Sequence, residues 1–384
     1  MKNKIKIAVT IANPVGWYKK NVLGGGEVII KDILEGMNNI KIFVVKTKNI
    51  KLNKKIVSRT IILPFESKRN LIKDIINLKY WVLKSTLVLL KQNVDIYYAS
   101  TTNISDFLPA FFASMLKKKV LLTKCHISIY KGNNKLFIDI YNNIKNEGFS
   151  KPKALINSFS PYIVFHLLSK ANKIICVSNN IKQTLIYRGI SENILEVNYN
   201  GLKIRKYKNR KKEYELAFVG RIEKYKGVYD FIKVCKEYKK IENDFKAIII
   251  GEGSEFGKLK KIAKNLDRNI VFTGFLGEKR FELLSKSKIM LMPSTANEGW
   301  GLSIAESIAC NTPVIAYDNE IFREVFGDVK NVYLVKNYME MKNKMIKLLT
   351  DYKYNRNIYK QAKKFDIKKS VKREEEIIKK YERF

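Results

Sequence analysis

Met292–Ala316 reads MPSTANEGWGLSIAESIACNTPVIA and is the most informative stretch of the chain. The apolar run that ends at Pro293 predicts a strand, and Leu302–Cys310 predicts a helix. Pro313–Tyr317 predicts the next strand. A Gly-Trp-Gly turn at 299–301 joins the first strand to the helix. The turn therefore follows the carboxyl end of a parallel strand, which is where open α/β sheets bind their ligands.

Apolar runs alternate with longer amphipathic stretches over the whole chain. Several runs are almost continuously apolar, as expected for parallel strands that helices cover on both faces. The sequence therefore predicts an α/β fold of two doubly wound domains. The other predicted strands are Ile5–Ala12, Ile40–Val45, Ile96–Ser100, Val120–Cys125, Lys173–Val177, Glu215–Val219, Phe245–Ile250, Ile270–Thr273 and Ile289–Pro293.

A polar and basic segment at 198–213, NYNGLKIRKYKNRKKE, lacks hydrophobic periodicity. It is the predicted linker between a first domain at 1–197 and a second at 214–364. Two domains also suit the length, because a single hydrophobic core seldom extends over 384 residues. No apolar run of about 18 residues occurs, so no transmembrane helix is expected. The opening residues predict a strand and are too short an apolar run for a signal peptide.

The composition is that of a globular and strongly basic protein. Hydrophobic residues at 46% and aromatic residues at 11% argue against disorder. The 74 Lys and Arg residues against 36 Asp and Glu give a net charge of +38. This charge attracts nucleic acid, anionic lipid or a phosphorylated substrate, or it reflects a compositional bias toward Lys. The four cysteines lie far apart without CxxC spacing, so no zinc site or disulfide framework is expected, and a reducing cytoplasm fits.

The stretch 70–93 combines Leu, Ile, Tyr and Trp side chains with lysines at positions 73, 79, 84 and 91. A basic amphipathic helix of this kind, with Tyr80 and Trp81 as an aromatic pair, can lie at the headgroup level of an anionic membrane. The commoner alternative is a helix that packs on the first sheet. The sequence leaves both alternatives open and favours the second.

Two carboxylates accompany the turn of the first segment. Glu298 stands directly before Gly299, and Glu306 lies in the predicted helix. The amides of the first helical turn, at Leu302 and Ser303, suit a diphosphate because they lie at the positive end of the helix dipole. Glu298 would then face a sugar and Glu306 a nucleoside. Alternatively, both carboxylates are ordinary helix-end and surface groups.

A second motif, FVGRIEKYKG, covers 218–227. The predicted strand ends at Gly220, and two cations, Arg221 and Lys226, follow in one loop. A diphosphate leaves readily once its developing charge is neutralised, and an Arg fork with a nearby Lys can do this without a metal. No DxD pair occurs in the chain, so neither a metal ion nor another cofactor is expected. By themselves, two cations in so basic a protein would be ordinary surface residues.

A third motif, LGGGEV, covers 23–28 and lies between the first strand and a helix predicted to begin near Glu27. Three consecutive glycines at a strand-to-helix turn favour close approach of the backbone to a ligand. They are equally consistent with a tight turn that has no ligand.

Taken in order, these motifs resemble those of retaining glycosyltransferases of the large family 4 type, whose GT-B fold consists of two facing Rossmann-like domains. The resemblance extends over nearly the whole chain and is strongest at 215–325. It also implies a C-terminal helix, 365–384, that returns to the first domain. The motifs that carry it are Gly24–Gly26, VNYNGL at 197–202, 219–227, IGEG at 250–253, FTGF at 272–275, and 293–316.

The resemblance implies a role for each matching residue. Arg221 and Lys226 would hold the donor diphosphate, and Glu306 would bind the ribose. Glu298 and His126, which follows the strand VLLTKC, would act at the donor sugar or the acceptor. Together with Glu306, the implied donor-binding residues are Gly25, Gly26 and Gly220, the base-lining Gly274, Phe275 and Leu276, and the turn and helix start at Gly299, Trp300, Gly301, Leu302 and Ser303.

The chain departs from the family pattern at several positions. Ile127 stands where an Asp often follows the His, and Lys203 replaces an acidic residue after Asn200-Gly201. Asn311 replaces a Gly after the helix, a substitution that left-handed helix caps tolerate. No glycine pair precedes Arg323-Glu324. These departures affect the expected donor and leave the expected reaction unchanged.

The sequence thus predicts a metal-independent hexosyltransferase of cell-surface glycan biosynthesis. It would transfer a sugar from a nucleotide-diphosphate donor to a lipid-linked or polysaccharide acceptor, with retention of configuration. The expected location is the cytoplasm, with peripheral contact to an anionic membrane, and nucleic acid is not an expected partner. The alternatives are a nucleotide-sugar epimerase or hydrolase of the same fold, and a basic nucleic-acid-binding protein, for which no recognised motif is present.

Overall fold

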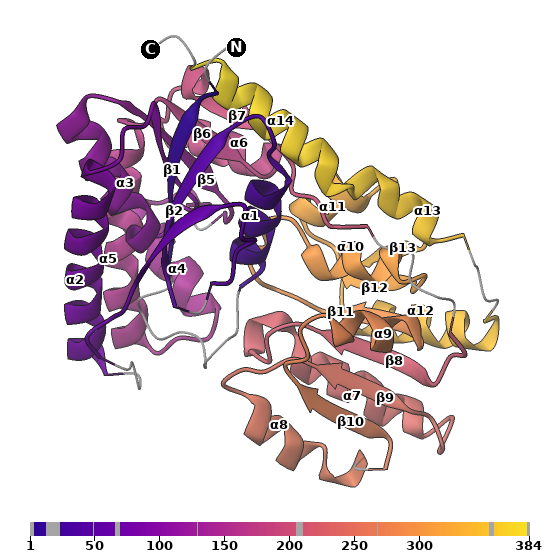
Figure 1. Ribbon diagram of the computed structural model, residues 1–384. Helices are drawn as coiled ribbons and strands as arrows, with labels where there is room; N and C mark the ends of the chain where they lie inside the picture. The colour runs from indigo at the N-terminus through magenta and orange to yellow at the C-terminus, as the bar shows by residue number, and fades with distance from the viewer. Residues whose placement is uncertain are drawn as a thin grey trace. The chain divides into compact units, whose positions relative to one another are not determined.

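The computed structural model describes residues 4–12, 24–48, 50–65, 70–128, 130–204, 210–266, 268–352 and 357–381. The chain divides into two compact units. Unit 1 comprises Met1–Ile144, Ser150–Gly201 and Ile367–Phe384, and unit 2 comprises Lys145–Phe149 and Leu202–Asp366. Each unit is a parallel sheet with helices packed against it (Figure 1). The predicted fold class, two Rossmann-like α/β domains, is confirmed.

In the described part of unit 1, seven strands form one parallel sheet in the order β3-β2-β1-β4-β5-β6-β7. The strand order reverses direction between β1 and β4, which makes this the topological switch point of a doubly wound sheet. The elements are β1 Lys6–Ile11, α1 Gly25–Gly36, β2 Lys41–Thr47, β3 Val57–Ile61, α2 Leu71–Leu90, β4 Ile96–Ala99, α3 Ile104–Lys117, β5 Val120–Cys125, α4 Leu136–Asn146, α5 Lys151–Leu168, β6 Lys173–Cys176, α6 Asn179–Tyr187, η1 Glu192–Ile194, β7 Leu195–Val197 and α14 Ile367–Lys379.

In the described part of unit 2, six parallel strands have the order β10-β9-β8-β11-β12-β13. Here the switch point lies between β8 and β11. The elements are β8 Tyr214–Val219, η2 Lys224–Lys226, α7 Val228–Lys239, β9 Ala247–Ile250, α8 Phe256–Ile262, η3 Lys264–Leu266, β10 Ile270–Gly274, α9 Lys279–Ser285, β11 Ser287–Met292, α10 Leu302–Ala309, β12 Val314–Tyr317, α11 Glu320–Phe326, β13 Val332–Val335, α12 Tyr338–Thr350, α13 Tyr359–Ala362 and η4 Lys363–Phe365.

Three strands were not predicted from the sequence: β3, β7 and β13. All three lie at the edge of a sheet, where only one side of the strand pairs with a neighbour. β3 reads VSRTI and is exposed over most of its length, and β7 has only three residues. β3 therefore lacks the continuous apolar pattern of central parallel strands, and β7 is too short to show one. β13 reads VYLV, a short apolar run that does indicate a strand.

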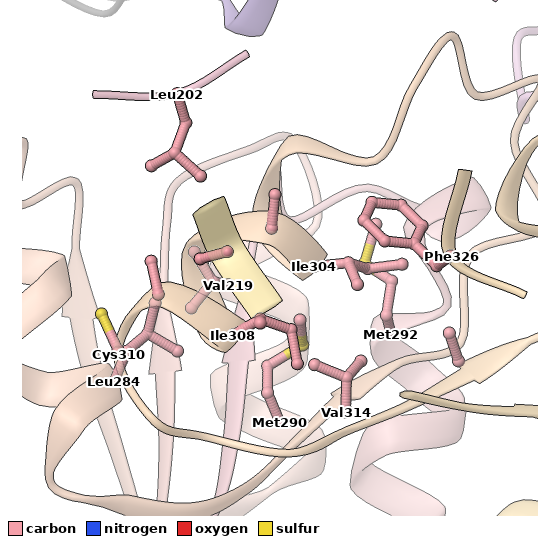
Figure 2. Packing of buried hydrophobic residues seen from close by; sticks show 14 of the residues in the cluster. Leu202, Val219, Leu284, Met290, Met292, Ile304, Ile308, Cys310, Val314 and Phe326 are labelled. Carbon is pink, nitrogen blue, oxygen red and sulfur yellow. The ribbon is translucent and has the colours of Figure 1, made fainter. Parts of the chain in front are cut away.

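Below α10, one face of the unit 2 sheet packs against a dense apolar cluster. Figure 2 shows Met290 and Met292 of β11 with Ile304 and Ile308 of α10, and Phe326 beside them. All five side chains are buried. Filled cores of this kind resist displacement, because moving a packed side chain leaves a cavity or a clash. The cluster therefore fixes α10 relative to the end of β11.

The C-terminal helix α14 belongs to unit 1 and packs beside α1 (Figure 1). A Cβ at Gly36 of α1 would lie 2.7 Å from Val371 of α14, so the two helices approach closely. Glu374 of α14 forms a fully buried ion pair with Lys124 of β5, with 2.7 Å between Nζ and Oε2. Tyr98 Oη and Asn198 Nδ2 also donate hydrogen bonds to the Glu374 carboxylate. These contacts hold the end of the chain against the first sheet.

Helix α2 packs on the sheet of unit 1 and also exposes apolar side chains. Trp81 is fully buried, and its Nε1 donates a hydrogen bond of 2.8 Å to the Ser105 carbonyl. Trp81 therefore fits the favoured alternative, a helix that packs on the first sheet, and cannot belong to an aromatic pair at a headgroup layer. Within the described residues, no helix combines the length and the apolar character needed to cross a bilayer.

Candidate active site

Two loops of unit 2 meet at the switch point between β8 and β11. The backbone N–H of Thr295, after β11, donates to the carbonyl of Tyr225 in the loop after β8, at 2.9 Å. Gly227 ends that loop in a left-handed conformation with φ +73°. A Cβ at this position would lie only 1.7 Å from the Pro293 carbonyl oxygen. The residue at 227 must therefore be glycine if the two loops are to pack this closely.

The contact between the loops places Lys226 against Glu298. Lys226 Nζ lies 2.6 Å from Glu298 Oε1, and both side chains are largely buried. Ser294 Oγ donates a second hydrogen bond of 2.6 Å to the same carboxylate oxygen. Burial raises the pKa of Glu298, but the charge of Lys226 and these hydrogen bonds outweigh it and hold the pKa below its ordinary value. Glu298 is therefore an ionised hydrogen-bond acceptor at neutral pH.

Arg221 adds a second cation to the same loop. Its guanidinium lies 5.4 Å from the centre of the Tyr225 ring, and Lys226 Nζ lies 5.8 Å from that ring. The charge of Arg221 also contributes to lowering the pKa of Glu298. Arg221 and Lys226 therefore share one electrostatic environment with Glu298, which lies 72 residues after Lys226 in the sequence.

Helix α10 begins beside this cluster. Its N-cap, Gly301, has φ +100°, and no side chain caps the helix start. A Cβ at Gly301 would lie 2.7 Å from the Phe326 ring, so packing as well as backbone conformation requires glycine. The Trp300 side chain is buried against Phe326 and Phe365, so this residue presents its backbone and not its ring to the helix start. The first-turn residues Leu302 and Ser303 follow directly.

Glu306 lies one turn further along α10 and is held by a residue that the sequence analysis did not name. Arg280 of α9 donates two hydrogen bonds to its carboxylate, from Nε at 3.0 Å and from Nη2 at 2.5 Å. The third nitrogen of the same guanidinium, Nη1, donates to the Gly277 carbonyl at 2.6 Å. A planar fork of this kind fixes both the position and the orientation of a carboxylate.

The turn at 274–276, which the resemblance assigned to the nucleobase, follows β10. Gly274 has φ +73°, and its carbonyl accepts a hydrogen bond of 3.0 Å from the Gly251 amide. Phe275 is exposed, with 45% of its surface accessible, and Leu276 is half-buried. Arg280 donates hydrogen bonds both to the Gly277 carbonyl and to Glu306, so it holds the end of this turn and the Glu306 carboxylate in fixed positions relative to each other.

Glu147 is a further carboxylate of unit 2 that the sequence analysis missed. It lies in the segment Lys145–Phe149, which had been assigned to the first domain on sequence order and instead belongs with unit 2. Burial raises the pKa of Glu147, although the charges of Arg221 and Lys226 act in the opposite direction. The two predicted phosphate-binding cations therefore have two carboxylates near them, Glu298 and Glu147.

In unit 1, the glycine motif and His126 come together at the carboxyl edge of the sheet. Helix α1 begins at Gly25, two residues earlier than predicted, and its N-cap Gly24 provides no side-chain cap. A Cβ at Gly26 would lie 3.7 Å from His126 Cγ, so the imidazole ring packs against the start of α1. Leu23, the first residue of the predicted motif, lies outside the described residues.

The His126 ring is neutral. Burial and the charge of Lys124 lower the pKa of His126 to about 3, against a hydrogen bond to the backbone of Ser100. Its Nε2 atom is buried and has no hydrogen-bond partner among the described residues. With the other ring nitrogen bonded to Ser100, Nε2 is a free acceptor that a ligand hydroxyl can satisfy.

Asp106 is a buried acidic residue of α3 that bonds to the end of β1, and it was also not predicted. Its carboxylate accepts hydrogen bonds from the Ala12 amide at 2.7 Å and from Thr101 Oγ1 at 2.6 Å. Burial raises the pKa of Asp106 to about 8, and the nearby charge of Glu27 contributes to this. Asp106 therefore fixes the chain directly after β1.

The structure brings the predicted site residues together in two groups, one in each unit. In unit 2 the group is the cation loop, Glu298, the start of α10, Glu306 and the turn at 274–276; in unit 1 it is Gly25, Gly26 and His126. Ser294 could have been found, because it lies in the quoted motif four residues before Glu298. Arg280, Glu147 and Asp106 stand in no motif, and only the fold reveals them. No group of three or more His, Cys, Asp or Glu side chains suited to a metal ion occurs within the described residues.

Comparison with known proteins agrees with this geometry. Residues 201–365, which include the whole unit 2 group, match the model of the family Glycosyl transferases group 1. The protein is a glycosyltransferase. An uncharacterised glycosyltransferase of Methanocaldococcus jannaschii is 27% identical over 328 residues, which is 80% of each chain. A poly(ribitol-phosphate) alpha-N-acetylglucosaminyltransferase of Staphylococcus aureus is 29% identical over 48% of this chain and 38% of its own length.

Solved structures share the fold of the glycosyltransferase over almost its full length. The Anabaena protein HepE, solved in complex with UDP-glucose, has a TM-score of 0.71 at 17% identity and covers 98% of this chain and 100% of its own. Sucrose-phosphate synthase from Thermosynechococcus elongatus has a TM-score of 0.74 at 14% identity, with 98% of each chain covered. At this level of identity the two structures support the GT-B fold alone.

Proposed function

We propose that the protein transfers a hexosyl group from a UDP-sugar to a lipid-linked or polysaccharide acceptor, with retention of configuration and without a metal. The observation that carries the proposal is the pairing of Lys226 with Glu298 beside Arg221, at the switch point of unit 2. Cations on one loop and an ionised carboxylate on the next suit a ligand that has a diphosphate at one end and sugar hydroxyls at the other.

In the proposed reaction, the bond between the anomeric carbon and the diphosphate oxygen breaks while the acceptor oxygen bonds to the same carbon. The acceptor proton passes to an oxygen of the departing phosphate. Arg221, Lys226 and the amides at the start of α10 neutralise the charge that develops on the diphosphate. Two fixed cations and a helix dipole supply the charge for which other enzymes use a metal ion.

The remaining residues orient the donor. Glu298 accepts hydrogen bonds from hydroxyls of the donor sugar, because its low pKa keeps it ionised. Glu306, held by Arg280, accepts hydrogen bonds from the ribose, and the turn at 274–276 lines the base. His126 uses its unpaired Nε2 to accept a hydroxyl of the donor sugar or the acceptor, while Gly25 and Gly26 allow a phosphate to approach the start of α1.

The choice of donor and acceptor class rests on relatives. HepE is described in complex with UDP-glucose, so UDP-hexoses are the first donors to test. An alpha-monoglucosyldiacylglycerol synthase of Streptococcus pneumoniae is 28% identical over 30% of this chain and 27% of its own length. Together with the poly(ribitol-phosphate) enzyme, it supports an acceptor that is a lipid or a cell-surface polymer. A lipid acceptor would require peripheral contact with the membrane.

The test is turnover of a panel of UDP-hexoses in EDTA, with and without a lipid extract. We expect UDP release that depends on the extract, and a product whose anomeric configuration, read by NMR, equals that of the donor. Glu298→Gln and Arg221→Ala should each abolish turnover. Equal UDP release without any acceptor would instead indicate a hydrolase or epimerase, and loss of activity in EDTA would contradict metal independence.

A further inference from the structure

Helices α2, α3 and α5 form an exposed face of unit 1 that combines apolar side chains with lysines. α3 packs against both α2 and α5, and Figure 1 shows the three helices beside one another. Thirteen exposed large hydrophobic residues lie on these three helices, compared with five in all the described residues of unit 2. We call this surface the three-helix face. Its apolar members are Leu71, Ile72, Ile75, Ile76, Leu83, Leu87, Phe112, Met115, Leu116, Leu155, Ile156, Phe159 and Ile163.

The apolar residues follow the helical period, so each helix presents a stripe and not scattered side chains. On α2, Ile72, Ile76, Leu83 and Leu87 are spaced by four or seven residues, and the opposite side holds the buried Trp81. On α5, the spacing from Leu155 through Phe159 to Ile163 repeats this pattern. Several side chains are strongly exposed, with 70% of Ile72 and 68% of Leu116 accessible. Contiguous exposure on this scale marks a surface that binds something apolar.

The three-helix face is positively charged, which indicates an anionic partner. Exposed lysines accompany the apolar stripes on all three helices, at 73, 79, 84, 117, 151 and 153. Acidic residues are almost absent: α2 has only the half-buried Asp74, α3 only the buried Asp106, and α5 none. Lysines interspersed with apolar side chains can extend toward anionic headgroups while their neighbours enter the acyl boundary.

We infer that the three-helix face binds the surface of a membrane rich in anionic lipid. This inference rests on the proposed function and extends it. It assigns the surface that would bring the enzyme to a lipid-linked acceptor. The buried half of each helix packs against the unit 1 fold, so binding needs no refolding of the domain. Apolar insertion and lysine attraction act together, and removing either one weakens binding.

The experiment is vesicle co-sedimentation of the full chain. One set of vesicles contains phosphatidylcholine alone, and the other contains equal parts of phosphatidylcholine and phosphatidylglycerol. The apolar variant carries Ile72→Gln, Leu83→Gln and Phe159→Gln, and the charge variant carries Lys73→Gln, Lys79→Gln and Lys84→Gln. Matched controls change equally exposed residues of unit 2: Ile241→Gln, Ile262→Gln and Met339→Gln for the apolar set, and Lys258→Gln, Lys260→Gln and Lys261→Gln for the charge set.

We expect the wild-type protein to bind the anionic vesicles and not the neutral ones. Both variants of the three-helix face should bind at least roughly tenfold more weakly, while the controls bind like wild type. Equal binding to both vesicle types, or equal losses in the controls, would overturn the inference. It would also be overturned if light scattering showed a dimer that the apolar variant dissociates, because a second copy would then cover the face.

The same samples separate this inference from the proposed function. UDP binding, followed by thermal shift, should be unchanged in all the variants, since none of the altered residues belongs to the candidate site. Vesicle binding without turnover of any UDP-hexose would leave the membrane surface in place and refute the proposed function. Turnover with a lipid acceptor in detergent, together with no vesicle binding, would refute the membrane surface alone.

Discussion

Arg280→Ala should weaken nucleotide binding even though Arg280 belongs to no recognised motif. The guanidinium donates two hydrogen bonds to Glu306 and one to the Gly277 carbonyl. The Glu306 side chain is only 5% exposed, so removal of its partner leaves a nearly buried carboxylate without its bidentate contact. Such a carboxylate turns toward water, and it then no longer points at the ribose that the proposed function assigns to it.

The magnitude follows from the number and type of contacts. Hydrogen bonds to charged groups each stabilise by roughly 1.5–3 kcal/mol net. Part of this free energy appears as lower stability of unit 2, and breaking a buried pair typically costs about 3 kcal/mol. In the variant, UDP binding must also order the Glu306 side chain. If this ordering costs about 2 kcal/mol of binding free energy, the Kd for UDP rises about 30-fold. Arg280→Lys keeps the charge but loses the planar fork, so its effect should be intermediate.

The assay is calorimetric titration with UDP and with a UDP analogue that lacks both ribose hydroxyls. Wild type should bind UDP more tightly than the analogue, and Arg280→Ala should remove most of that difference. Arg210→Ala is the matched control, because Arg210 forms a more exposed ion pair with Glu282 in the same unit. Equal losses for both ligands would refute a positioning role through the ribose. Tighter binding by Arg280→Ala would show that the guanidinium competes with the ligand for Glu306.

Four further predictions concern the parts of the fold that support the site. Glu374→Ala should lower the free energy of unfolding by about 3–5 kcal/mol in urea denaturation, because it leaves Lys124 buried and unpaired, whereas Lys124→Met with Glu374→Leu should recover most of the loss. Gly227→Ala should cost roughly 2 kcal/mol or more and weaken UDP binding, because its Cβ would clash with Pro293; unchanged stability would contradict the close loop packing. In NMR spectra of a His166→Gln variant, the His126 signal should show no titration between pH 5 and 8, since its pKa is about 3. The pKa of Asp106 is about 8 in the folded protein and 3.8 when unperturbed. Between these two values the folded state holds a proton that the unfolded state has released, so the free energy of unfolding falls as pH rises. Asp106→Asn should remove this part of the pH dependence, which pH-dependent urea denaturation measures.

The interior of each sheet could be predicted from the sequence because central parallel strands are covered on both faces. Runs such as Ala247–Ile250 are buried at every position, and the sequence records this as uninterrupted apolar character. The edge strands lack that constraint. β3 reads VSRTI and is mostly exposed, so its residues carry no pattern that separates them from a loop. β13 reads VYLV, a four-residue apolar run that could have been predicted as a strand.

Some residues of the candidate site could likewise be predicted from the sequence, and others could not. Residues on the turns that directly follow a strand, such as Arg221 and Glu298, could be found because glycines mark these turns in the sequence. Asn311 was also interpreted correctly: it adopts φ +58° after α10, and its side chain accepts a hydrogen bond of 2.8 Å from the Tyr359 amide. Arg280 could not be predicted. It donates hydrogen bonds to Glu306, which lies 26 residues later, and its own helix, α9, contains no motif that marks a binding residue.

The low pKa of His126 depends in part on a residue that the C-terminal helix α14 holds in place. Lys124 lies two residues earlier on β5, and its charge is one cause of the lowered pKa of His126. Glu374 of α14 pairs with that lysine in the core, and Tyr98 and Asn198 donate hydrogen bonds to the same carboxylate. Without α14, Lys124 would be an unpaired charge in the core, which is strongly unfavourable. If the lysine then moved out of the core, the His126 ring would lose a neighbouring charge that opposes its protonation. The C-terminal helix therefore stabilises unit 1 and also helps to keep a hydrogen-bond acceptor available at the candidate site.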